Sequence, residues 1–364
     1  MKKFTKVILS VLFTCVLTFA LLFFFAPETF EKISAPTLTF EAGNYTDYYY
    51  VRLNDNEKLA YTALKQELPK FSEKIPIPEI SSNEFNNVLN VLSYDDPYLF
   101  MSDGGTILTV GKLKYYEPAY KLTKQEYDSS LEQINLIADE ILKELPQDEY
   151  EAQLYLHDYI INNCTYSDTD SNEESNIIGV FLNKKAKCSG YASAFKLLLD
   201  KAGIESVLIT GKATDSDGNI QSHMWNAVKI EDSWVYTDTT WDDPVSDDGK
   251  EYCRRIYFSM SEDMLRRTHG EFEFDFEAKD ASLYYYNVIN AYYNNYNSDT
   301  KNAVARLIAA AAAAGEDSVQ FMFVSKSAYN TAVDRLFEGE EIYGILESAD
   351  RNSAKHIETN SVRY

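Results

Sequence analysis

Three residues in the middle of the sequence have the types and the spacing needed for thiol chemistry: Cys188, His223 and Asp238. A cysteine attacks a carbonyl only as a thiolate, and a free thiol with a pKa of about 8.5 is mostly protonated at neutral pH. An imidazole beside the sulfur would take its proton, and a carboxylate on the other side of the ring would fix the tautomer. We therefore interpret the three residues as the nucleophile, the base and the orienting acid of a catalytic triad.

A helix expected over residues 189–202 positions the cysteine. Apolar residues recur there at helical spacing, namely Ala192, Phe195, Leu198 and Leu199. Gly203 is the expected C-cap. Cys188 thus stands at the helix N-terminus, where free N–H groups and the positive end of the helix dipole favour the thiolate.

A predicted hairpin positions the other two residues. β-like runs cover residues 205–213, 223–230 and 234–239. Turn signals separate them at Asp217-Gly218 and at Glu231-Asp232. His223 is expected to open the second run and Asp238 to end the third, so pairing of these two strands would bring the imidazole to the carboxylate.

Four segments of the chain resemble the bacterial branch of the transglutaminase-like superfamily. They are Cys188-Ser189-Gly190-Tyr191-Ala192, Ala202-Gly203-Ile204, His223-Met224-Trp225-Asn226 and Asp238-Thr239-Thr240-Trp241-Asp242-Asp243-Pro244. The resemblance covers roughly residues 125 to 270. It implies a papain-like α+β core, in which the helix bearing the nucleophile packs on an antiparallel sheet, and it gives the catalytic roles to Cys188, His223 and Asp238.

The residue that would stabilise the oxyanion in this chain differs from the one in the animal transglutaminases. Those enzymes have an aromatic residue upstream of the cysteine that helps to hold the oxyanion, whereas no tryptophan precedes Cys188. Tyr166 is the candidate in this chain. The backbone N–H of Cys188 is expected to supply another donor, as a helix N-terminus does.

The implied reaction is acyl transfer to peptide or amide carbonyls through a thioester. Resolution by water would make the chain a cysteine peptidase or amidase, and resolution by an amine a transglutaminase; the sequence does not choose between them. The alternative is a non-catalytic surface binding or scaffold protein, against which the three intact triad residues count. A metal site built on Cys188 and His223 lacks compact CxxC or HxxxH spacing, so no metal and no cofactor are expected.

The other histidines and cysteines are expected to be less important for the thiol chemistry. His157 is predicted on a helix face partly open to solvent, and His269 in a polar context. Cys164 and Cys253 form either one disulfide or two free thiols. Three aromatic residues beside the motifs are interpreted as packing residues: Tyr191, Trp225 and Trp241.

The first 26 residues are typical of an export signal. Lys2, Lys3 and Lys6 precede the run 7–25, nineteen uncharged and mostly apolar residues. As a helix this run would be about 28 Å long, close to the thickness of the bilayer core, so a retained membrane anchor is the alternative. Lipid attachment at Cys15 is disfavoured because the cysteine lies in the middle of the run. We expect an extracellular or cell-surface protein that meets the membrane only through this segment.

The charge of the chain bears on its partners. Without the three lysines of the leader the net charge goes from −23 to −26. No basic stripe exists to neutralise phosphates, so nucleic acid is not expected as a partner. A peptide or protein substrate is expected, and this class includes cell-wall peptides.

The remaining patterns predict an α+β protein of several parts. We assign 1–26 to the signal or anchor and 27–122 to an accessory α+β region with a helix over 55–68. The transglutaminase-like domain spans 123–278 and begins with helices over 123–145 and 148–163. Residues 279–364 are predicted to form a small α/β domain, with a helix over 299–314 and a final strand over 356–363.

Overall fold

The computed structural model describes residues 39–348 apart from residue 170, residues 244–252 and residue 317. The predicted signal or anchor and the predicted strand at 356–363 lie outside the described residues. The chain divides into two compact units, Met1–Tyr127 and Asp128–Tyr364. Among the described residues, no helix is long and apolar enough to span a lipid bilayer.

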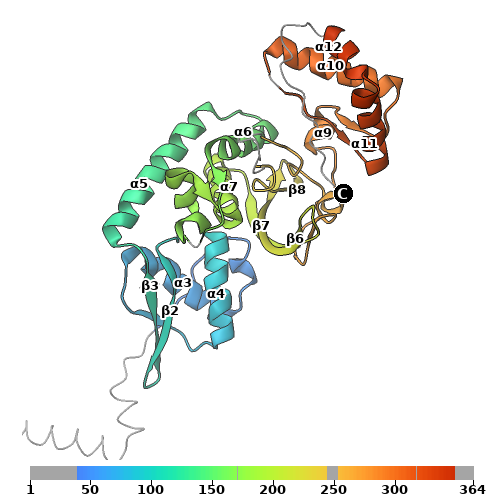
Figure 1. Ribbon diagram of the computed structural model, residues 1–364. Helices are drawn as coiled ribbons and strands as arrows, with labels where there is room; N and C mark the ends of the chain where they lie inside the picture. Colours follow the sequence, from blue (N-terminus) through green and yellow to red (C-terminus); the bar gives the residue numbers. More distant parts are fainter. Residues whose placement is uncertain (1–38, 170, 244–252, 317, 349–364) are drawn as a thin grey trace, which may run out of the picture. The chain divides into compact units, whose positions relative to one another are not determined.

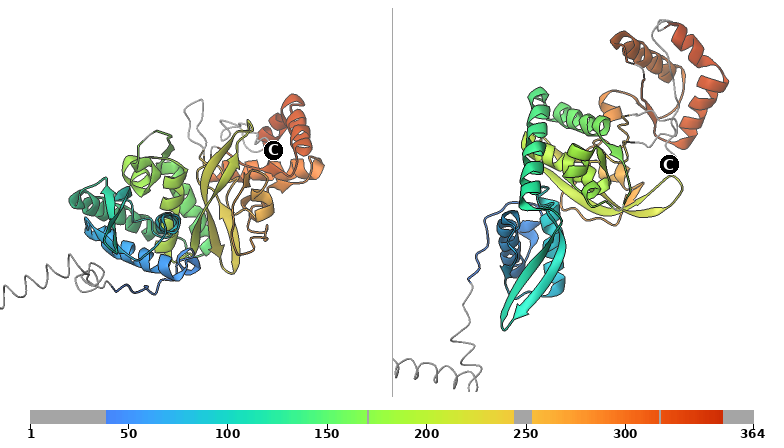
Figure 2. Two further views of the ribbon diagram at one scale, coloured as in Figure 1. Left: turned by 90° about the horizontal axis from the view of Figure 1, so that it is seen from below. Right: turned by 60° about the vertical axis from the view of Figure 1, so that its left-hand side comes forward.

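The first unit combines helices with a small antiparallel sheet of order β1-β3-β2. Its elements are η1 (Tyr50–Arg52), α3 (Asp55–Glu67), η2 (Leu68–Lys70), β1 (Ile75–Ile77), α4 (Ser82–Asp95), β2 (Ser102–Val110) and β3 (Leu113–Tyr120). α3 was predicted, and it begins with a capping box in which Asn54 and Glu57 satisfy each other's backbone N–H groups. The long β2–β3 hairpin is drawn in cyan (Figure 2).

The helix α4 was not predicted from the sequence, where the helix expected in the accessory region 27–122 was the one over 55–68. Ser81 and Glu84 form a second capping box at its start. Its buried residues recur at helical spacing and include Phe85, Val88, Val91 and Leu92. Both signals were present in the sequence and both predict a helix.

Three helices carry or support the site, and the first of them starts in the last residues of the first unit and continues into the second (Figure 1). They are α5 (Lys124–Ile141), followed by η3 (Leu142–Glu144), α6 (Glu149–Asn163) and α7 (Cys188–Ala202). α6 is capped by the Asp148 side chain, which accepts from the N–H of Glu151 at 3.0 Å. α7 ends at Gly203, whose φ of 79° is favourable for a residue without a side chain. The three predicted helices are therefore present, with boundaries shifted by at most four residues.

An antiparallel sheet of order β8-β7-β6-β9 packs against α7. Its strands are β6 (Ser206–Thr214), β7 (Ile220–Ile230), β8 (Ser233–Thr237) and β9 (His269–Gly270). This arrangement confirms the α+β core predicted from the sequence, with a helix that begins at the cysteine packed on an antiparallel sheet. β7 begins three residues earlier than predicted, so His223 lies inside the strand, and β8 ends just before Asp238.

The rest of the second unit contains mostly short elements and one longer helix, α10. They are β4 (Thr165–Tyr166), η4 (Glu173–Ser175), η5 (Gly179–Asn183), β5 (Lys185–Ala186), α8 (Glu262–Leu265), α9 (Tyr285–Val288), β10 (Tyr292–Tyr293), α10 (Ser298–Ala314), β11 (Met322–Phe323), α11 (Lys326–Val333), η6 (Asp334–Glu338) and α12 (Glu341–Ser348). From Tyr296 onwards these elements bury a core of their own, which includes Val304, Ile308, Phe323 and Leu336. The parallel pair β10–β11 and the helix α10 agree with a small α/β arrangement.

Candidate active site

Cys188 is the first residue of α7, as predicted. The preceding residue, Lys187, is in an extended conformation and makes no side-chain capping bond. The thiol is half-buried and free. The N–H groups of the first helical turn have no partners within the helix, so the sulfur lies at the electropositive end of α7.

A close backbone contact holds the start of α7 in place. The N–H of Lys187 donates to the carbonyl oxygen of Glu174 at 2.8 Å. A Cβ atom at position 190 would lie 2.5 Å from the same oxygen, so only glycine fits there. The requirement for Gly190, two residues after the thiol, therefore follows from the packing of η4 against α7.

His223 and Asp238 meet because of the strand register. Asn226 of β7 pairs with Thr237, the last residue of β8, so Asp238 continues along β7 toward His223. Nε2 of His223 lies 2.7 Å from Oδ2 of Asp238. Both side chains are buried, with exposed fractions of 3% and 0%.

Four donors surround the Asp238 carboxylate. Oδ1 accepts from the backbone N–H groups of Thr240 and Trp241 at 3.0 and 3.2 Å. Oδ2 lies close to the imidazoles of His223 and His269, at 2.7 and 3.1 Å. Burial by itself would raise the pKa of Asp238, but the charges and hydrogen bonds of the two imidazoles outweigh it and hold that pKa well below its usual range. Asp238 is therefore an anion throughout the neutral range.

The imidazole of His223 is strongly basic. Burial lowers its pKa, but the charge and the hydrogen bond of Asp238, together with the hydrogen bond and charge of Cys188, raise the pKa of His223 to about 10. Since Nε2 bonds to Asp238, Nδ1 is the nitrogen left for the Cys188 thiol. The arrangement can move a proton from sulfur to ring while the carboxylate balances the charge of the ring.

Tyr166 also lies at this site. It belongs to the short strand β4, which pairs in parallel with β5, so that Tyr166 is opposite Ala186, two residues before the cysteine. Burial raises the pKa of Tyr166, and the charges of Asp168 and Cys188 raise it further. Tyr166 is thus close enough to the sulfur to interact with it electrostatically.

Aromatic rings enclose the His223 imidazole. The ring centroids of Trp225 and Trp241 lie 6.1 and 5.3 Å from that of His223. Trp225 is 1% exposed, whereas Trp241 is half-buried. The hydroxyl group of Tyr191, which is also buried, donates to the Asp243 carboxylate. These contacts agree with the packing roles expected from the sequence, and they exclude water from most of the imidazole.

The expectation that His157 is partly exposed was wrong, because its side chain is completely buried. His269, expected in a polar context, is also completely buried and bonds to Asp238. The periodicity of α6 could have placed His157, because its buried positions include Tyr150, Gln153, Leu156 and Ile160, on the same face. His269 lies in the two-residue strand β9, which is too short to give a sequence pattern.

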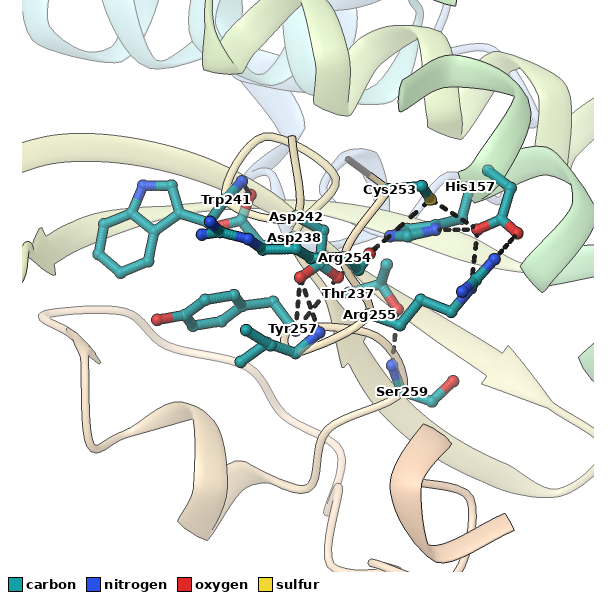
Figure 3. Close-up of polar contacts among 12 residues, drawn as sticks. His157, Thr237, Asp238, Trp241, Asp242, Cys253, Arg254, Arg255, Tyr257 and Ser259 are labelled. Atoms are coloured by element: carbon teal, nitrogen blue, oxygen red, sulfur yellow. Dashed lines mark hydrogen bonds and ion pairs between the residues drawn. The ribbon is translucent and has the colours of Figure 1, made fainter. Parts of the chain in front are cut away.

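His157 belongs to a second buried polar cluster, shown in Figure 3. Its Nδ1 lies 2.9 Å from Oδ1 of Asp158 and its Nε2 lies 3.1 Å from Oδ2 of Asp242. Arg255 and the thiol of Cys253 also donate to Asp158. Burial opposes the charged form of His157, but the bonds to the two carboxylates and to Cys253 raise its pKa well above the usual value. The cluster connects α6 to the segments on either side of residues 244–252.

The carboxylate of Asp242 joins two segments that are distant in the sequence. Its Oδ1 accepts from the backbone N–H groups of Ile256 and Tyr257 at 2.8 and 2.9 Å. Figure 3 shows this carboxylate between Tyr257 and His157. Asp242 therefore fixes the loop after Asp238 to the 256–257 segment.

Gln153 anchors the residues that precede Asp238. The amide of this fully buried residue donates to Oγ1 of Thr237 at 2.8 Å and accepts from Oγ of Ser259 at 3.0 Å. The N–H of Ser259 in turn donates to Thr237 at 3.1 Å (Figure 3). This closed network holds the end of β8, and with it Asp238, against α6.

Two groups of side chains have metal-ligating atoms within 4.8 Å of one another: His223 with Asp238 and His269, and His157 with Asp158 and Cys253. In both groups these atoms already bond to each other as donors and acceptors. We therefore interpret both as proton-sharing networks. Cys164 and Cys253 are free thiols, so of the two alternatives left open by the sequence the structure has the unbridged one.

Comparison with known proteins agrees with this architecture. The model of the transglutaminase-like superfamily matches residues 137–239, from within α5 to just beyond Asp238. No curated protein matches the chain.

Several solved structures are similar to parts of the chain. A protein described as a TGase is 16% identical, over 50% of this chain and 52% of its own, with a TM-score of 0.29. A proposed cysteine protease from Cytophaga hutchinsonii is 16% identical, over 30% of this chain and 37% of its own, with a TM-score of 0.26. The periplasmic domain of TgpA from Pseudomonas aeruginosa is 16% identical, over 35% of this chain and 54% of its own, with a TM-score of 0.23. The matches thus span about half or less of these proteins. Residues 137–239 of this chain, which contain Cys188, His223 and Asp238, belong to the transglutaminase-like superfamily.

Proposed function

We propose that the chain is an exported thiol acyl-transfer enzyme that acts on peptide or amide bonds. Cys188 is the nucleophile, His223 the general base and Asp238 the residue that orients the imidazole. One observation carries the proposal. Nε2 of His223 bonds to a buried carboxylate at 2.7 Å, which leaves Nδ1 to interact with a thiol at the N-terminus of a helix.

The reaction follows from these positions. The Cys188 thiol gives its proton to Nδ1 of His223, and the thiolate attacks the substrate carbonyl to form a tetrahedral oxyanion. The backbone N–H of Cys188 and the hydroxyl of Tyr166 are the proposed oxyanion donors. The imidazolium then protonates the leaving amine as the C–N bond breaks, and a thioester remains. Attack by water or by an amine, deprotonated by His223, releases the acyl group and restores the thiol.

The substrate class in this proposal is a peptide or protein, with cell-wall peptides included. Hydrolysis makes the enzyme a cysteine peptidase or amidase, and aminolysis makes it a transglutaminase. Export rests on the lysine-flanked apolar run at residues 7–25. The proposal places the enzyme outside the cell, either secreted or anchored by that run.

An activated ester tests acyl transfer before the substrate is known. The full chain is incubated with p-nitrophenyl acetate, and acetylated peptides are mapped by mass spectrometry. We expect a burst of nitrophenolate and an acetyl group on Cys188, with neither in Cys188→Ser and both in the matched control Cys164→Ser. Acetyl groups spread evenly over the four cysteines of the chain would contradict the proposal. Added amines then distinguish the two outcomes, because a transglutaminase releases the acetyl group as an amide.

A further inference from the structure

His269 occupies a position that the proposed triad does not account for. Its Nε2 lies 3.1 Å from Oδ2 of Asp238, the same oxygen that bonds to His223 at 2.7 Å. Its side chain has no exposed surface. We propose that His269 is a positioning residue that shares the Asp238 carboxylate with His223 and thereby supports the activation of Cys188. The inference rests on the proposed function.

The surroundings of His269 set its tautomer. The hydroxyl of Thr268 lies 2.9 Å from Nδ1. When this hydroxyl donates to Nδ1, the ring carries its proton on Nε2 and donates it to Asp238. Two backbone contacts fix the position of the ring. His269 pairs with Ala213 of β6, and the N–H of Thr214 donates to the carbonyl oxygen of Thr268 at 2.8 Å.

Aromatic packing immobilises the His269 ring. Its centroid lies 4.7 Å from that of Trp241, 4.8 Å from that of Trp225 and 5.6 Å from that of Tyr257. Trp225 and Trp241 also contact His223. The two imidazoles therefore lie within one aromatic enclosure, with ring centroids 5.6 Å apart and one carboxylate oxygen between them.

The shared oxygen has a physical consequence. With Thr240 and Trp241 donating to Oδ1, the bonds to the two imidazoles are what restrain Oδ2. Without the His269 donor, Oδ2 would be held by His223 alone and would be less restrained opposite Nε2 of His223, and the charge of the carboxylate would be less delocalised. A less restrained carboxylate stabilises the protonated form of His223 less well, and a more concentrated charge on Asp238 makes the electrostatic potential at Cys188 more negative. Both changes disfavour the thiolate at Cys188.

The other ionisable groups nearby do not replace this donor. Tyr257 faces His269 through its ring. Asp242 interacts electrostatically with Asp238, but its own carboxylate bonds to His157 and to backbone N–H groups. Of the imidazoles in the described part of the chain, those of His223 and His269 bond to Asp238.

A double-mutant cycle in the full chain tests the inference. The readout is the rate at which iodoacetamide alkylates Cys188 at pH 6, measured by peptide mapping. His269→Met removes the donor, His269→Gln keeps an N–H at a similar reach, and each is combined with Asp238→Asn. The matched control is His157→Met, which removes the other histidine that is completely buried among the described residues.

We expect His269→Met to slow alkylation by about fivefold, because only part of the free energy of the lost hydrogen bond to Asp238 reaches Cys188 through His223. His269→Gln should restore most of the rate, and His269→Met should have no further effect in the Asp238→Asn background. His157→Met should lower the melting temperature without slowing alkylation. An unchanged rate in His269→Met, or effects that multiply with Asp238→Asn, would overturn the inference. If wild-type Cys188 is not activated at all, the proposed function itself fails, which is a distinguishable result.

Discussion

Replacing Asp238 with asparagine should reverse the polarity of the bond that orients His223. The backbone N–H groups of Thr240 and Trp241 require an acceptor at the Oδ1 position, so the amide oxygen of the new side chain takes that place. Its NH₂ group then lies at the Oδ2 position, 2.7 Å from Nε2 of His223. The ring must accept there, which moves its proton to Nδ1. A protonated Nδ1 cannot take the proton of the Cys188 thiol.

The size of the effect follows from the chemistry of the nucleophile. The equivalent change in a serine protease triad lowers kcat by about 10⁴-fold through the wrong tautomer. A thiol is several pKa units more acidic than a serine hydroxyl and depends less on its base, so we expect a loss of about 10² to 10³-fold here. The variant also loses a charged hydrogen bond, which is worth about 2 kcal/mol of stability.

The assay is the acetylation rate of Cys188 by p-nitrophenyl acetate, with urea unfolding in parallel to show that the variant is folded. Asp242→Asn is the matched control, because Asp242 is equally buried but bonds to His157. We expect the control to lose stability and to keep its acetylation rate. A folded Asp238→Asn variant that acetylates within about threefold of the wild-type rate would refute the reasoning, since such a difference is less than 1 kcal/mol in activation free energy.

Three further predictions concern pH, the oxyanion and the polar network. The pKa of His223 is raised to about 10 in the folded state, so the contribution of its charged form to stability is complete below about pH 6.5 and disappears as the pH rises through 10. The difference in melting temperature between wild type and His223→Gln should therefore shrink between these two pH values. A difference that stays constant would contradict this prediction. Tyr166→Phe should lower the acetylation rate by about 10 to 100-fold while leaving iodoacetamide labelling unchanged, because alkylation forms no oxyanion; equal effects on both rates would exclude the oxyanion role. Gln153→Leu should destabilise the fold by about 1 to 3 kcal/mol in urea unfolding, since it removes the acceptor of the buried Ser259 hydroxyl and one of the two donors to Thr237 Oγ1. Cys188 labelling in the folded variant should persist.

The parts of the site that lie in contiguous patterns could be predicted from the sequence. The periodicity after Cys188 and the glycine at 203 located α7, and the two turn signals located the hairpins that pair β7 with β6 and β8. Strand pairing over short turns is local, so the approach of His223 to Asp238 followed from spacing alone. The half-buried Tyr166 could be proposed only through the family resemblance.

The parts that depend on distant contacts could not be predicted. His269 reaches Asp238 because β9 pairs with β6 over a long connection, and no local pattern fixes that register. The buried state of His157 depends on Asp242, 85 positions later in the chain. Sequence patterns assign polar residues to the surface by default, whereas a polar residue with enough partners is stable in a core.

The most direct test of the account is the pH dependence of thiol labelling in the full chain. Iodoacetamide is applied between pH 5 and 8, and the alkylated cysteines are quantified by mass spectrometry in wild type and in His223→Gln. Cys164 and Cys253 serve as internal controls, because burial raises the pKa of both thiols, that of Cys164 to about 11. The account predicts that Cys188 is labelled much faster than either control at pH 6 and that this advantage disappears in the variant. Labelling of Cys188 at the rate of an ordinary thiol, or an advantage that survives His223→Gln, would contradict the central claim.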